Sequence, residues 1–296
     1  MRILTRGDLD GLTSSVFLSI VEDIGEIRFA HPKDVQDGEI PVDKQDIIVN
    51  LPYVKGCGMW FDHHASEDRK LEAIGEFKGR FAVAPSAARV IHDHYNDPAF
   101  GRYDQMLRET DRLDSGQLGV EEVLDPRGWI LLGLTLDPRT GLGPQFQRYF
   151  RWLVEYAKEV PLEKILQHRE VNKRCEKVME EQKFFMGLLK GVCKLDGNVI
   201  ITDLRGVKRA PAGNRFLVFT MFPEANVEAR IFDGKLGNTV VAVGKSIFNR
   251  SCALNVGGLL AEYGGGGHYG AGTAQMANDV ADARIKEIVA RLKTAP

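Results

Sequence analysis

The stretch that decides the fold is Arg2-Ile3-Leu4-Thr5-Arg6-Gly7-Asp8-Leu9-Asp10-Gly11-Leu12, near the amino terminus. Its first four residues favour a short strand, and the apolar spacing over 12–24 predicts a helix that ends at Gly25. Asp8 and Asp10 therefore lie between a strand and a helix. The carboxyl ends of parallel strands are where ligands bind, and two alternate carboxylates can point at one hard cation or a cation pair. Taken alone, the motif also fits an ordinary turn with a helix N-cap.

Further strand-like runs follow at 26–30, 46–50 and 58–61, and the chain from 85 to about 157 is mainly helical in pattern. Apolar runs of this kind, with a helix between the first two, are typical of a parallel sheet in an α/β domain. We therefore predict a first domain over residues 1–157.

The pattern changes after this region. A long amphipathic stretch predicts a linker helix over 158–192, although it also fits a packing helix of the first domain. Spaced strands with turn signals follow, then a glycine-rich segment and a helix at 279–292. The predicted strands are 199–201, 216–219, 227–232 and 239–243. We expect residues 193–296 to form a smaller α+β domain.

Composition limits the classes of function. The chain has 296 residues, with 39 Lys and Arg against 41 Asp and Glu, and a formal net charge of −2. This balance excludes a generally basic protein that coats nucleic acid. Hydrophobic residues make up 44% and charged residues 27%, as in a soluble globular protein. The sequence has no apolar run long enough to span a bilayer and no amino-terminal signal segment, so we expect a cytoplasmic location without a membrane partner.

A second polar cluster, Asp62-His63-His64, directly follows the strand predicted at 58–61. Asp and His together at one strand end suit a borderline metal such as Mn²⁺. Because it also lies at a carboxyl end, we expect this cluster to converge with Asp8 and Asp10 at one edge of the sheet.

Asp137 lies in a turn that ends an apolar helix, so it is either one more carboxylate ligand or part of a helix terminus stopped by Pro138. Three other carboxylates lie on a predicted helix or at its end, and most are expected to be solvated or structural. They are Asp104, Asp111 and Asp114.

The run Tyr263-Gly264-Gly265-Gly266-Gly267-His268 is the sharpest feature of the second domain. Consecutive glycines expose backbone N–H groups and let a phosphate approach closely, and the adjacent His268 can donate to it. Upstream, Asn249-Arg250-Ser251 offers a planar guanidinium for a phosphate. The alternative for the glycine run is a flexible loop. The predicted substrate-binding residues are Asn249, Arg250, Gly265, Gly266, Gly267 and His268.

An early DxDG, then DHH, then a helix-end turn with Asp, then GGGGH resembles the DHH phosphoesterase superfamily with its DHH-associated C-terminal domain. The resemblance covers nearly the whole chain. The segments around His31-Pro32-Lys33-Asp34 and Asn50-Leu51-Pro52-Tyr53 are similar to an exopolyphosphatase-like subgroup, and nanoRNases are further relatives. The resemblance implies an N-terminal metal-binding and catalytic domain, a helical linker and a substrate-binding domain.

Transferred residue by residue, the family's site implies four metal ligands and a group of catalytic residues that act on the reacting phosphate. The implied ligands are Asp8, Asp10, His63 and Asp137. The implied catalytic residues are Asp10, His63 and His64, with His64 contacting phosphate and Asp62 supporting the ligands, and we add Arg6 as a catalytic residue that can itself hold a phosphate.

Two positions depart from the family's pattern. Arg6, which cannot ligate a metal, stands at the leading ligand position, and the neutral Asn50 stands at the bridging position. Removing a bridging anion and adding a fixed positive charge both disfavour a pair of cations. The resemblance and these departures together predict one divalent cation per chain, Mn²⁺ or another such as Mg²⁺.

Three functions remain open from the sequence. The first is a metal-dependent phosphohydrolase acting on a short phosphorylated substrate, namely polyphosphate, a short oligonucleotide or a dinucleotide. The second is a phosphate-ligand-binding protein with a degenerate, inactive metal site, which Arg6 and Asn50 favour. The third, a nucleic-acid-binding module, is disfavoured by the charge balance. A homodimer is left open.

Overall fold

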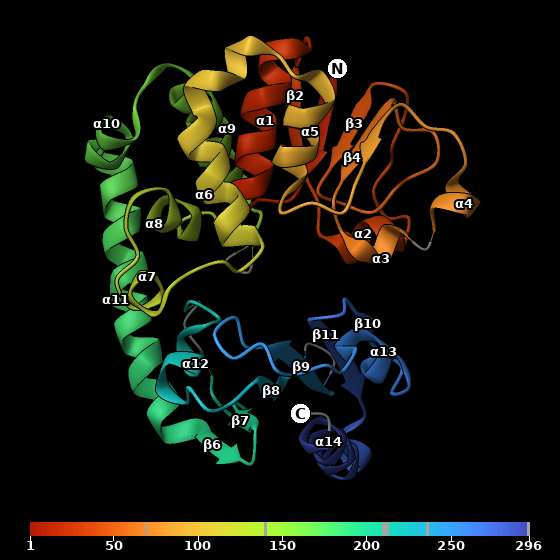
Figure 1. Ribbon diagram of the computed structural model, residues 1–296, viewed down its shortest axis with the longest axis vertical. Helices are drawn as coiled ribbons and strands as arrows, with labels where there is room; N and C mark the ends of the chain where they lie inside the picture. Colours follow the sequence, from red (N-terminus) through yellow and green to blue (C-terminus); the bar gives the residue numbers. More distant parts are fainter. Residues whose placement is uncertain (69, 139–140, 209–212, 235–236, 295–296) are drawn as a thin grey trace. The chain divides into compact units, whose positions relative to one another are not determined.

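The computed structural model describes residues 1–68, 70–138, 141–208, 213–234 and 237–294. By its internal contacts the chain divides into two compact units. The first comprises Met1–Leu118 and Pro126–Val178, and the second comprises Gly119–Asp125 and Met179–Pro296. Figure 1 shows the elements of both units, which are described separately below.

The first unit is built on a five-stranded, fully parallel sheet with the strand order β2-β1-β3-β4-β5. The strands are β1 (Arg2–Thr5), β2 (Glu26–Phe29), β3 (Asp46–Val49), β4 (Met59–Asp62) and β5 (Gly79–Phe81). The chain moves from β1 to β2 on one side and returns to β3 on the other. The order therefore reverses beside β1, at the kind of switch point where open α/β sheets bind ligands. These features confirm the α/β fold class predicted from the sequence.

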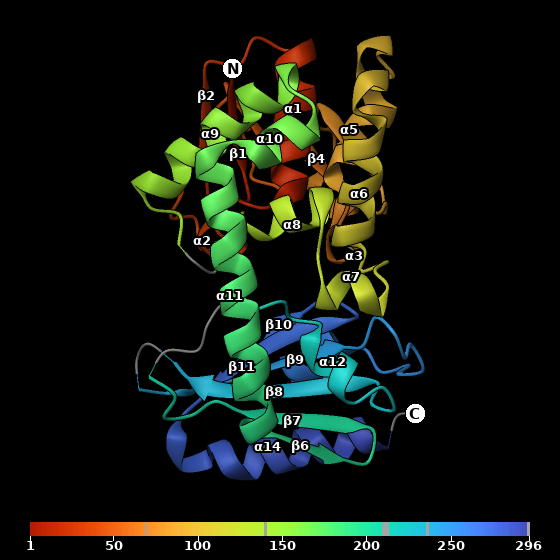
Figure 2. The same cartoon turned by 90° about the vertical axis from the view of Figure 1, so that its left-hand side faces the viewer.

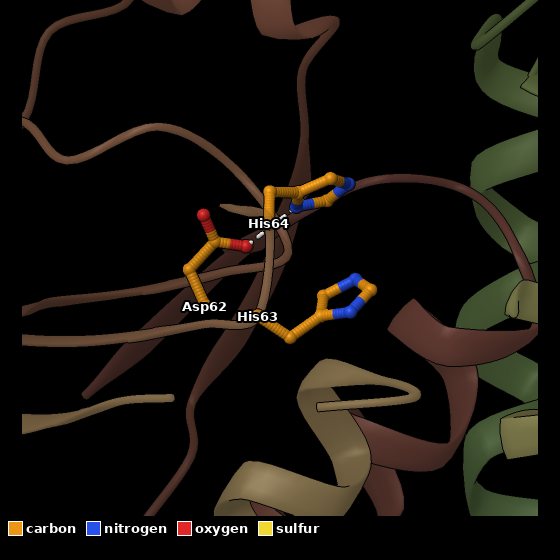
Figure 3. A group of neighbouring side chains, drawn as sticks. All are labelled: Asp62, His63 and His64. Atoms are coloured by element: carbon orange, nitrogen blue, oxygen red, sulfur yellow. Dashed lines mark hydrogen bonds and ion pairs between the residues drawn. The ribbon is translucent and has the colours of Figure 1, made fainter. Parts of the chain in front are cut away.

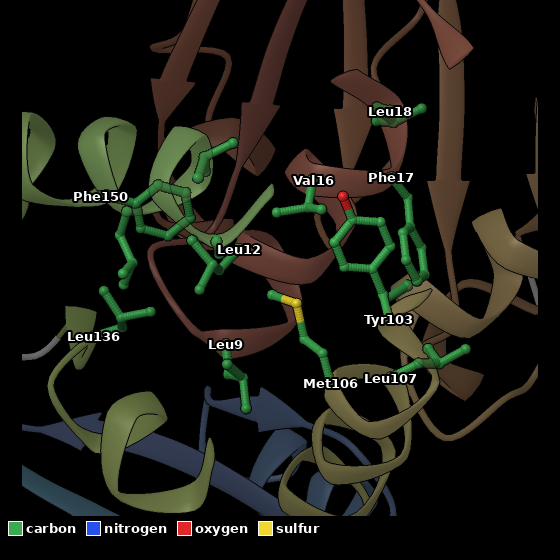
Figure 4. Close-up of a cluster of buried hydrophobic side chains, with 14 of the residues drawn as sticks. Leu9, Leu12, Val16, Phe17, Leu18, Tyr103, Met106, Leu107, Leu136 and Phe150 are labelled. Atoms are coloured by element: carbon green, nitrogen blue, oxygen red, sulfur yellow. The ribbon is translucent and has the colours of Figure 1, made fainter. Parts of the chain in front are cut away.

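Alternating side chains of the short strands cover both faces of this sheet. Ile3, Ile47 and Phe61 pack on one face into the core that the helices complete, and Figure 4 shows part of this cluster around α1. Leu4 and Trp60 lie in a smaller cluster on the other face. The central strands have apolar residues at consecutive positions because both faces of the sheet are buried.

The helices of the first unit include several that the sequence pattern indicated only as a helical region. They are α1 (Leu9–Val21), α2 (Pro32–Gln36), α3 (Ala65–Asp68), α4 (Leu71–Ile74), α5 (Ala87–Tyr95), the 3₁₀ helix η1 (Pro98–Tyr103), α6 (Asp104–Asp114), α8 (Gly128–Leu134), α9 (Pro144–Glu159) and α10 (Leu162–Gln167). The first helix begins at Leu9, three residues before the predicted start. Asp8 is its N-cap and accepts the Gly11 N–H at 2.9 Å, so the first turn forms directly behind the carboxylates.

The long helix α11 (Arg169–Val192) continues from the first unit into the second, and Figure 2 shows it without a break. The stretch predicted as one linker helix is two helices, α10 and α11, divided at His168. No helix in the described part of the chain has both the length and the apolar character needed to cross a bilayer.

The second unit contains a six-stranded mixed sheet with the order β10-β11-β9-β8-β7-β6. Its elements are α7 (Val120–Leu124), β6 (Cys193–Asp196), β7 (Val199–Asp203), α12 (Leu217–Met221), β8 (Val227–Asp233), β9 (Thr239–Lys245), α13 (Val256–Ala261), β10 (Gly266–Gly267), β11 (Ala271–Met276) and α14 (Asn278–Lys293). The apolar side chains of α13 and α14 pack on one face of this sheet and form its core.

The strand predicted at 216–219 is wrong, because these residues form the start of α12. Aromatic and β-branched side chains favoured a strand there. In the structure the segment is a short buried helix beside α7, and Asn214 accepts the N–H of Phe216 before it begins. Tertiary packing and this local turn override the local propensity.

Candidate active site

The polar residues predicted at the strand ends gather at the carboxyl edge of the first sheet. Asp8 and Asp10 follow β1, Asn50 follows β3, and the Asp62-His63-His64 cluster closes β4. Since β1, β3 and β4 are adjacent in the sheet, one edge brings all of them together. The convergence that the sequence predicted is present.

Asp8 is held by two neighbours besides its own helix. Arg6 Nε lies 3.2 Å from Asp8 Oδ2, and the Asn50 side-chain amide donates to Asp8 Oδ1 at 3.1 Å. The charge of Asp8 raises the pKa of Arg6, so the guanidinium stays protonated. Asn50 is fully buried and has φ of 55°, a backbone region that non-glycine residues rarely adopt. Such outliers cluster at functional sites.

Asp10 is a deeply buried carboxylate, with only 2% of its surface exposed. Its Oδ2 accepts the Ala87 N–H at 2.9 Å, and its Oδ1 accepts the Ala88 N–H at 2.8 Å. Both donors belong to the first turn of α5, where the helix dipole favours an anion. Burial nevertheless raises the pKa of Asp10 to about 7, and the nearby carboxylates Asp114 and Asp8 act in the same direction.

His63 is oriented through its other ring nitrogen. Its Nδ1 lies 3.0 Å from the Ala84 carbonyl oxygen, and because a carbonyl only accepts, this nitrogen carries the proton in the neutral ring. The lone pair is then on Nε2, which lies 3.7 Å from Asp10 Oδ2 and 3.3 Å from Asp114 Oδ2. A ring fixed in this way is arranged as metal-binding histidines usually are.

His64 points its Nδ1 at Asp62 Oδ1, 2.7 Å away, as Figure 3 shows. Burial alone would lower the pKa of His64, but the hydrogen bond and charge of Asp62, together with Asp114, raise it above its ordinary value. The raised pKa means that His64 holds a proton more readily than an ordinary histidine.

Three buried polar atoms here have no hydrogen-bond partner within the described residues: Asn50 Oδ1, Asp62 Oδ2 and His63 Nε2. Two groups of side chains also present ligand atoms that all lie within 4.8 Å of one another, namely Asp62-His63-His64 and Asp10-His63-Asp114. Unsatisfied buried oxygen and imidazole atoms are costly unless a ligand satisfies them, and this donor set suits Mn²⁺ or Mg²⁺. The residues present therefore fit a divalent cation.

Asp137, which the sequence offered as a ligand, lies half-buried after α8, next to residues 139–140, which are not described. It belongs to neither group of potential ligands formed by the described residues. Its role as a ligand stays a prediction.

Asp114 is the residue that the sequence reasoning missed. It was set aside with the solvated carboxylates, yet it ends α6 within 3.3 Å of His63. A signal was available, because Asp114 lies four residues after Thr110 and seven after Leu107, and both are buried. Helix periodicity therefore places this carboxylate on the inward face, where a solvated acid is not expected.

Two side chains of the polar loop predicted in the second unit donate hydrogen bonds to backbone carbonyls. The Asn249 amide donates to the Glu224 carbonyl at 3.0 Å, and Arg250 Nε donates to the Ile247 carbonyl at 3.1 Å. Asn249 therefore shapes the loop, while the exposed Arg250 is presented by it.

The glycine run ends in the short hairpin strand β10, and close packing requires glycine at two of its positions. A Cβ at Gly265 would lie 2.2 Å from the Thr273 carbonyl oxygen, and one at Gly267 would lie 2.3 Å from the Ala271 oxygen. Only Gly266, of the three predicted to bind phosphate, has no atom within 4 Å of such a Cβ among the described residues. Close packing thus explains two of these glycines, and Gly266 keeps an open side.

Beside this hairpin lies an amine that the sequence gave no reason to select. Lys245 ends β9, its backbone N–H donates to the Gly270 carbonyl at 2.9 Å, and its Nζ lies 3.6 Å from the centre of the Tyr269 ring. The Nζ atom is buried without a hydrogen-bond partner in the described chain, and burial lowers the pKa of Lys245. The exposed His268 precedes Tyr269 in the same turn.

Comparison with solved structures places this architecture in a known class. The chain is similar to a pGpG-specific phosphodiesterase, PggH, from Vibrio cholerae, with 36% sequence identity, a TM-score of 0.80, and coverage of 100% of this chain and 99% of that one. An exopolyphosphatase-related protein from Bacteroides fragilis matches at 12% identity and a TM-score of 0.55, covering 99% of this chain and 92% of that chain.

A DHH domain from a member of the S1p family of ribosomal proteins matches at 14% identity and a TM-score of 0.67, covering 99% and 87% of the two chains. At these lower identities the second and third likenesses show the fold alone. No protein-family model matches the chain, and no curated protein matches it. The full-length similarity at 36% identity establishes that the chain belongs to the DHH phosphoesterase superfamily, and it is an enzyme of that class.

Proposed function

We propose that this protein is a divalent-metal-dependent phosphodiesterase that hydrolyses short linear dinucleotides, with pGpG as the first substrate to test. The observation that carries the proposal is the similarity to PggH, at 36% identity over essentially the full length of both chains. The exopolyphosphatase-like alternative has a fold likeness at 12% identity as its support, which carries less weight for the substrate.

The proposed cation site is centred on Asp10, His63 and Asp114, with Asp62 and His64 beside it. When bound there, a divalent cation supplies positive charge to a phosphoryl oxygen and lowers the pKa of a coordinated water. The buried Asn50 Oδ1 supports the assignment, because its hydrogen-bonding capacity is unused in the described chain. We keep the expectation of one cation per chain, and Mn²⁺ is the ion to test first.

The chain's own residues have separate roles in this proposal. Arg6 is paired with Asp8, so it holds a fixed positive charge at the sheet edge and can bind a phosphoryl oxygen. His64, kept near its charged form by Asp62, donates a proton or a hydrogen bond to the phosphate or the leaving oxygen.

The second unit is proposed to bind substrate groups other than the phosphate that is cleaved. Arg250, His268 and the open backbone at Gly266 are the predicted contacts, and the buried Lys245 amine is an addition from the structure. These groups donate hydrogen bonds, as phosphate oxygens require.

The substrate assignment is tested with purified protein and Mn²⁺ on pGpG, pApA and inorganic polyphosphate. We expect mononucleotide release from the dinucleotides and little phosphate release from polyphosphate. Asp10→Ala should abolish turnover on every substrate. Hydrolysis of polyphosphate alone would contradict the dinucleotide assignment.

The division of roles is tested with Arg250→Ala on pGpG and on bis(p-nitrophenyl) phosphate, a diester without a remote phosphate. Losing a charged hydrogen bond costs about 1.5–3 kcal/mol, or roughly 10- to 150-fold in kcat/KM. We expect this loss on pGpG only. An equal loss on both diesters would place Arg250 at the reacting phosphate instead.

A further inference from the structure

One short segment contacts every element that contributes to the proposed cation site. Residues 84–89, which lead into α5, accept from His63 Nδ1 through the Ala84 carbonyl at 3.0 Å. The same segment donates the Ala87 and Ala88 N–H groups to the two oxygens of Asp10 at 2.9 and 2.8 Å. The orientations of two proposed ligands are thus set by one turn of backbone.

A single carboxylate of α6, Asp111, holds this segment by hydrogen bonds. Its Oδ1 accepts from the Ser86 hydroxyl at 2.7 Å, and its Oδ2 accepts from Arg89 Nε at 3.1 Å and Nη2 at 2.6 Å. Ser86 is also the N-cap of α5, because its hydroxyl oxygen accepts the Arg89 N–H at 3.0 Å. One carboxylate therefore holds both ends of the first turn of α5.

Asp111 lies three residues before Asp114 on the same helix, so the clamp also fixes the third proposed ligand. The pair of α5 and α6 is visible in Figures 1 and 2. A buried hydrogen bond of 2.7 Å between the Thr13 and Thr110 hydroxyls joins α6 to α1, the helix that carries Asp10. Asp10, His63 and Asp114 thus come from separate elements, and these hydrogen bonds connect the elements to one another.

We propose that Arg89 and Asp111 are positioning residues that set the spacing of Asp10, His63 and Asp114 for the cation. The proposal rests on the proposed cation site. Groups that hold metal ligands in place affect metal affinity as well as stability, since small shifts of the ligand atoms weaken every bond to the ion. Arg89 is suited to this role, because its planar fork fixes direction as well as charge.

The chain contains a matched control at the opposite edge of the same sheet. Arg2 donates from Nε and Nη2 to the two oxygens of Asp46, at 2.9 and 3.0 Å, at the amino ends of β1 and β3. The side chains of Arg2 and Arg89 are exposed to nearly the same extent, 28% and 27%. Arg→Lys at either position keeps the charge and removes the fork.

The test compares Mn²⁺ binding by calorimetry, and the electron paramagnetic resonance spectrum of the bound ion, in the wild type, Arg89→Lys and Arg2→Lys. We expect both variants to lose some thermal stability. Only Arg89→Lys should weaken Mn²⁺ binding, by about tenfold, and alter the spectrum, because only its pair contacts the ligand scaffold. An unchanged Kd and spectrum in Arg89→Lys, or equal weakening in both variants, would overturn the proposal.

Asp111→Asn is a second variant that tests the proposal, since it keeps an acceptor for the Ser86 hydroxyl and removes the negative charge opposite Arg89. We expect the same loss of affinity. If Arg89→Lys and Asp111→Asn both fail to fold while Arg2→Lys folds, the pair is a requirement for folding and the specific role is wrong. A wild type that binds no Mn²⁺ would refute the cation site itself, whereas normal Mn²⁺ binding without pGpG hydrolysis would refute the substrate assignment alone.

Discussion

The choice between Asp114 and Asp137 as the carboxylate that completes the cation site can be decided by two isosteric substitutions. Asp114→Asn removes one negative charge from a group whose ligand atoms lie within 4.8 Å of one another. Two unit charges 4 Å apart at an effective dielectric constant of 20 interact by about 4 kcal/mol, roughly a thousandfold in affinity. We expect at least this loss for a divalent ion, and little change in Asp137→Asn.

Thermal unfolding gives a direct assay. An ion present at a hundred times its Kd stabilises the folded protein by about 2.7 kcal/mol, whereas at a tenth of its Kd it stabilises by less than about 0.1 kcal/mol. For a unit of this size the first figure corresponds to a rise in Tm of about 5–10 °C. Mn²⁺ should therefore raise the Tm of the wild type and of Asp137→Asn, and leave that of Asp114→Asn nearly unchanged.

The metal-free proteins supply the control. Asp114 lies close enough to Asp10 to help raise the pKa of that carboxyl, so removing its charge relieves a repulsion. The metal-free Asp114→Asn protein should thus unfold at a temperature close to that of the wild type. A normal Mn²⁺ response in Asp114→Asn, with loss of the response in Asp137→Asn, would refute the structural assignment and restore the ligand expected from the sequence.

Three further predictions concern the two proposed sites. The double change Arg6→His with Asn50→Asp should raise the Mn²⁺ stoichiometry measured by calorimetry from one to two, since it replaces a fixed cation by a ligand and restores a bridging anion. Binding of only one equivalent of Mn²⁺ would mean that these two positions are misassigned. Mn²⁺ affinity should fall as the pH drops below about 7, because burial raises the pKa of Asp10 to about 7 and a proton then competes with the ion; titrations at pH 6 and 8 with equal affinity would contradict this. Gly266→Ala should keep its Tm but lose pGpG affinity. Gly267→Ala should unfold more easily, because residue 267 has a φ of 152° and its Cβ would clash with the backbone of Ala271. An unchanged KM in Gly266→Ala would remove this glycine from the substrate site.

The sequence could predict the first unit because local and long-range signals agree there. The runs that became β1 and β3 have apolar centres, Ile3-Leu4 and Ile47-Ile48-Val49, as strands buried on both faces need, and polar residues follow each of them. The prediction that Asp10 and His63 meet at one edge of the sheet followed from the parallel topology alone. The start of α1 was predicted three residues late because the helix was counted from the apolar spacing that begins at Leu12, whereas Asp8 caps the helix and starts it at Leu9.

The wrong strand at 216–219 and the omission of Asp114 have a common physical cause, since each depends on a partner distant in sequence. The helix α12 takes its form from packing beside α7 rather than from the propensity of Phe216 and its neighbours. The sequence also does not reveal that the backbone of β11 closely approaches Gly265 and Gly267, whose role in binding substrate stays a prediction. Asp114 becomes a candidate ligand only when α6 is packed against the edge of the sheet.

The environment of Asp10 explains how the site can keep its shape before any ion binds. A carboxylate buried to this extent, beside two others, would relax away from its neighbours if it were held by side chains alone. Two backbone N–H groups of α5 hold it instead, and a backbone turn cannot rotate aside as a side chain can. The turn is fixed by Asp111 of α6, the helix that also carries Asp114. Asp114, which repels Asp10, is therefore connected through Asp111 to the same turn whose N–H groups stabilise Asp10. Preorganisation of this kind shifts the cost of bringing like charges together from the binding of the ion to the folding of the chain, where the core of the first unit offsets it.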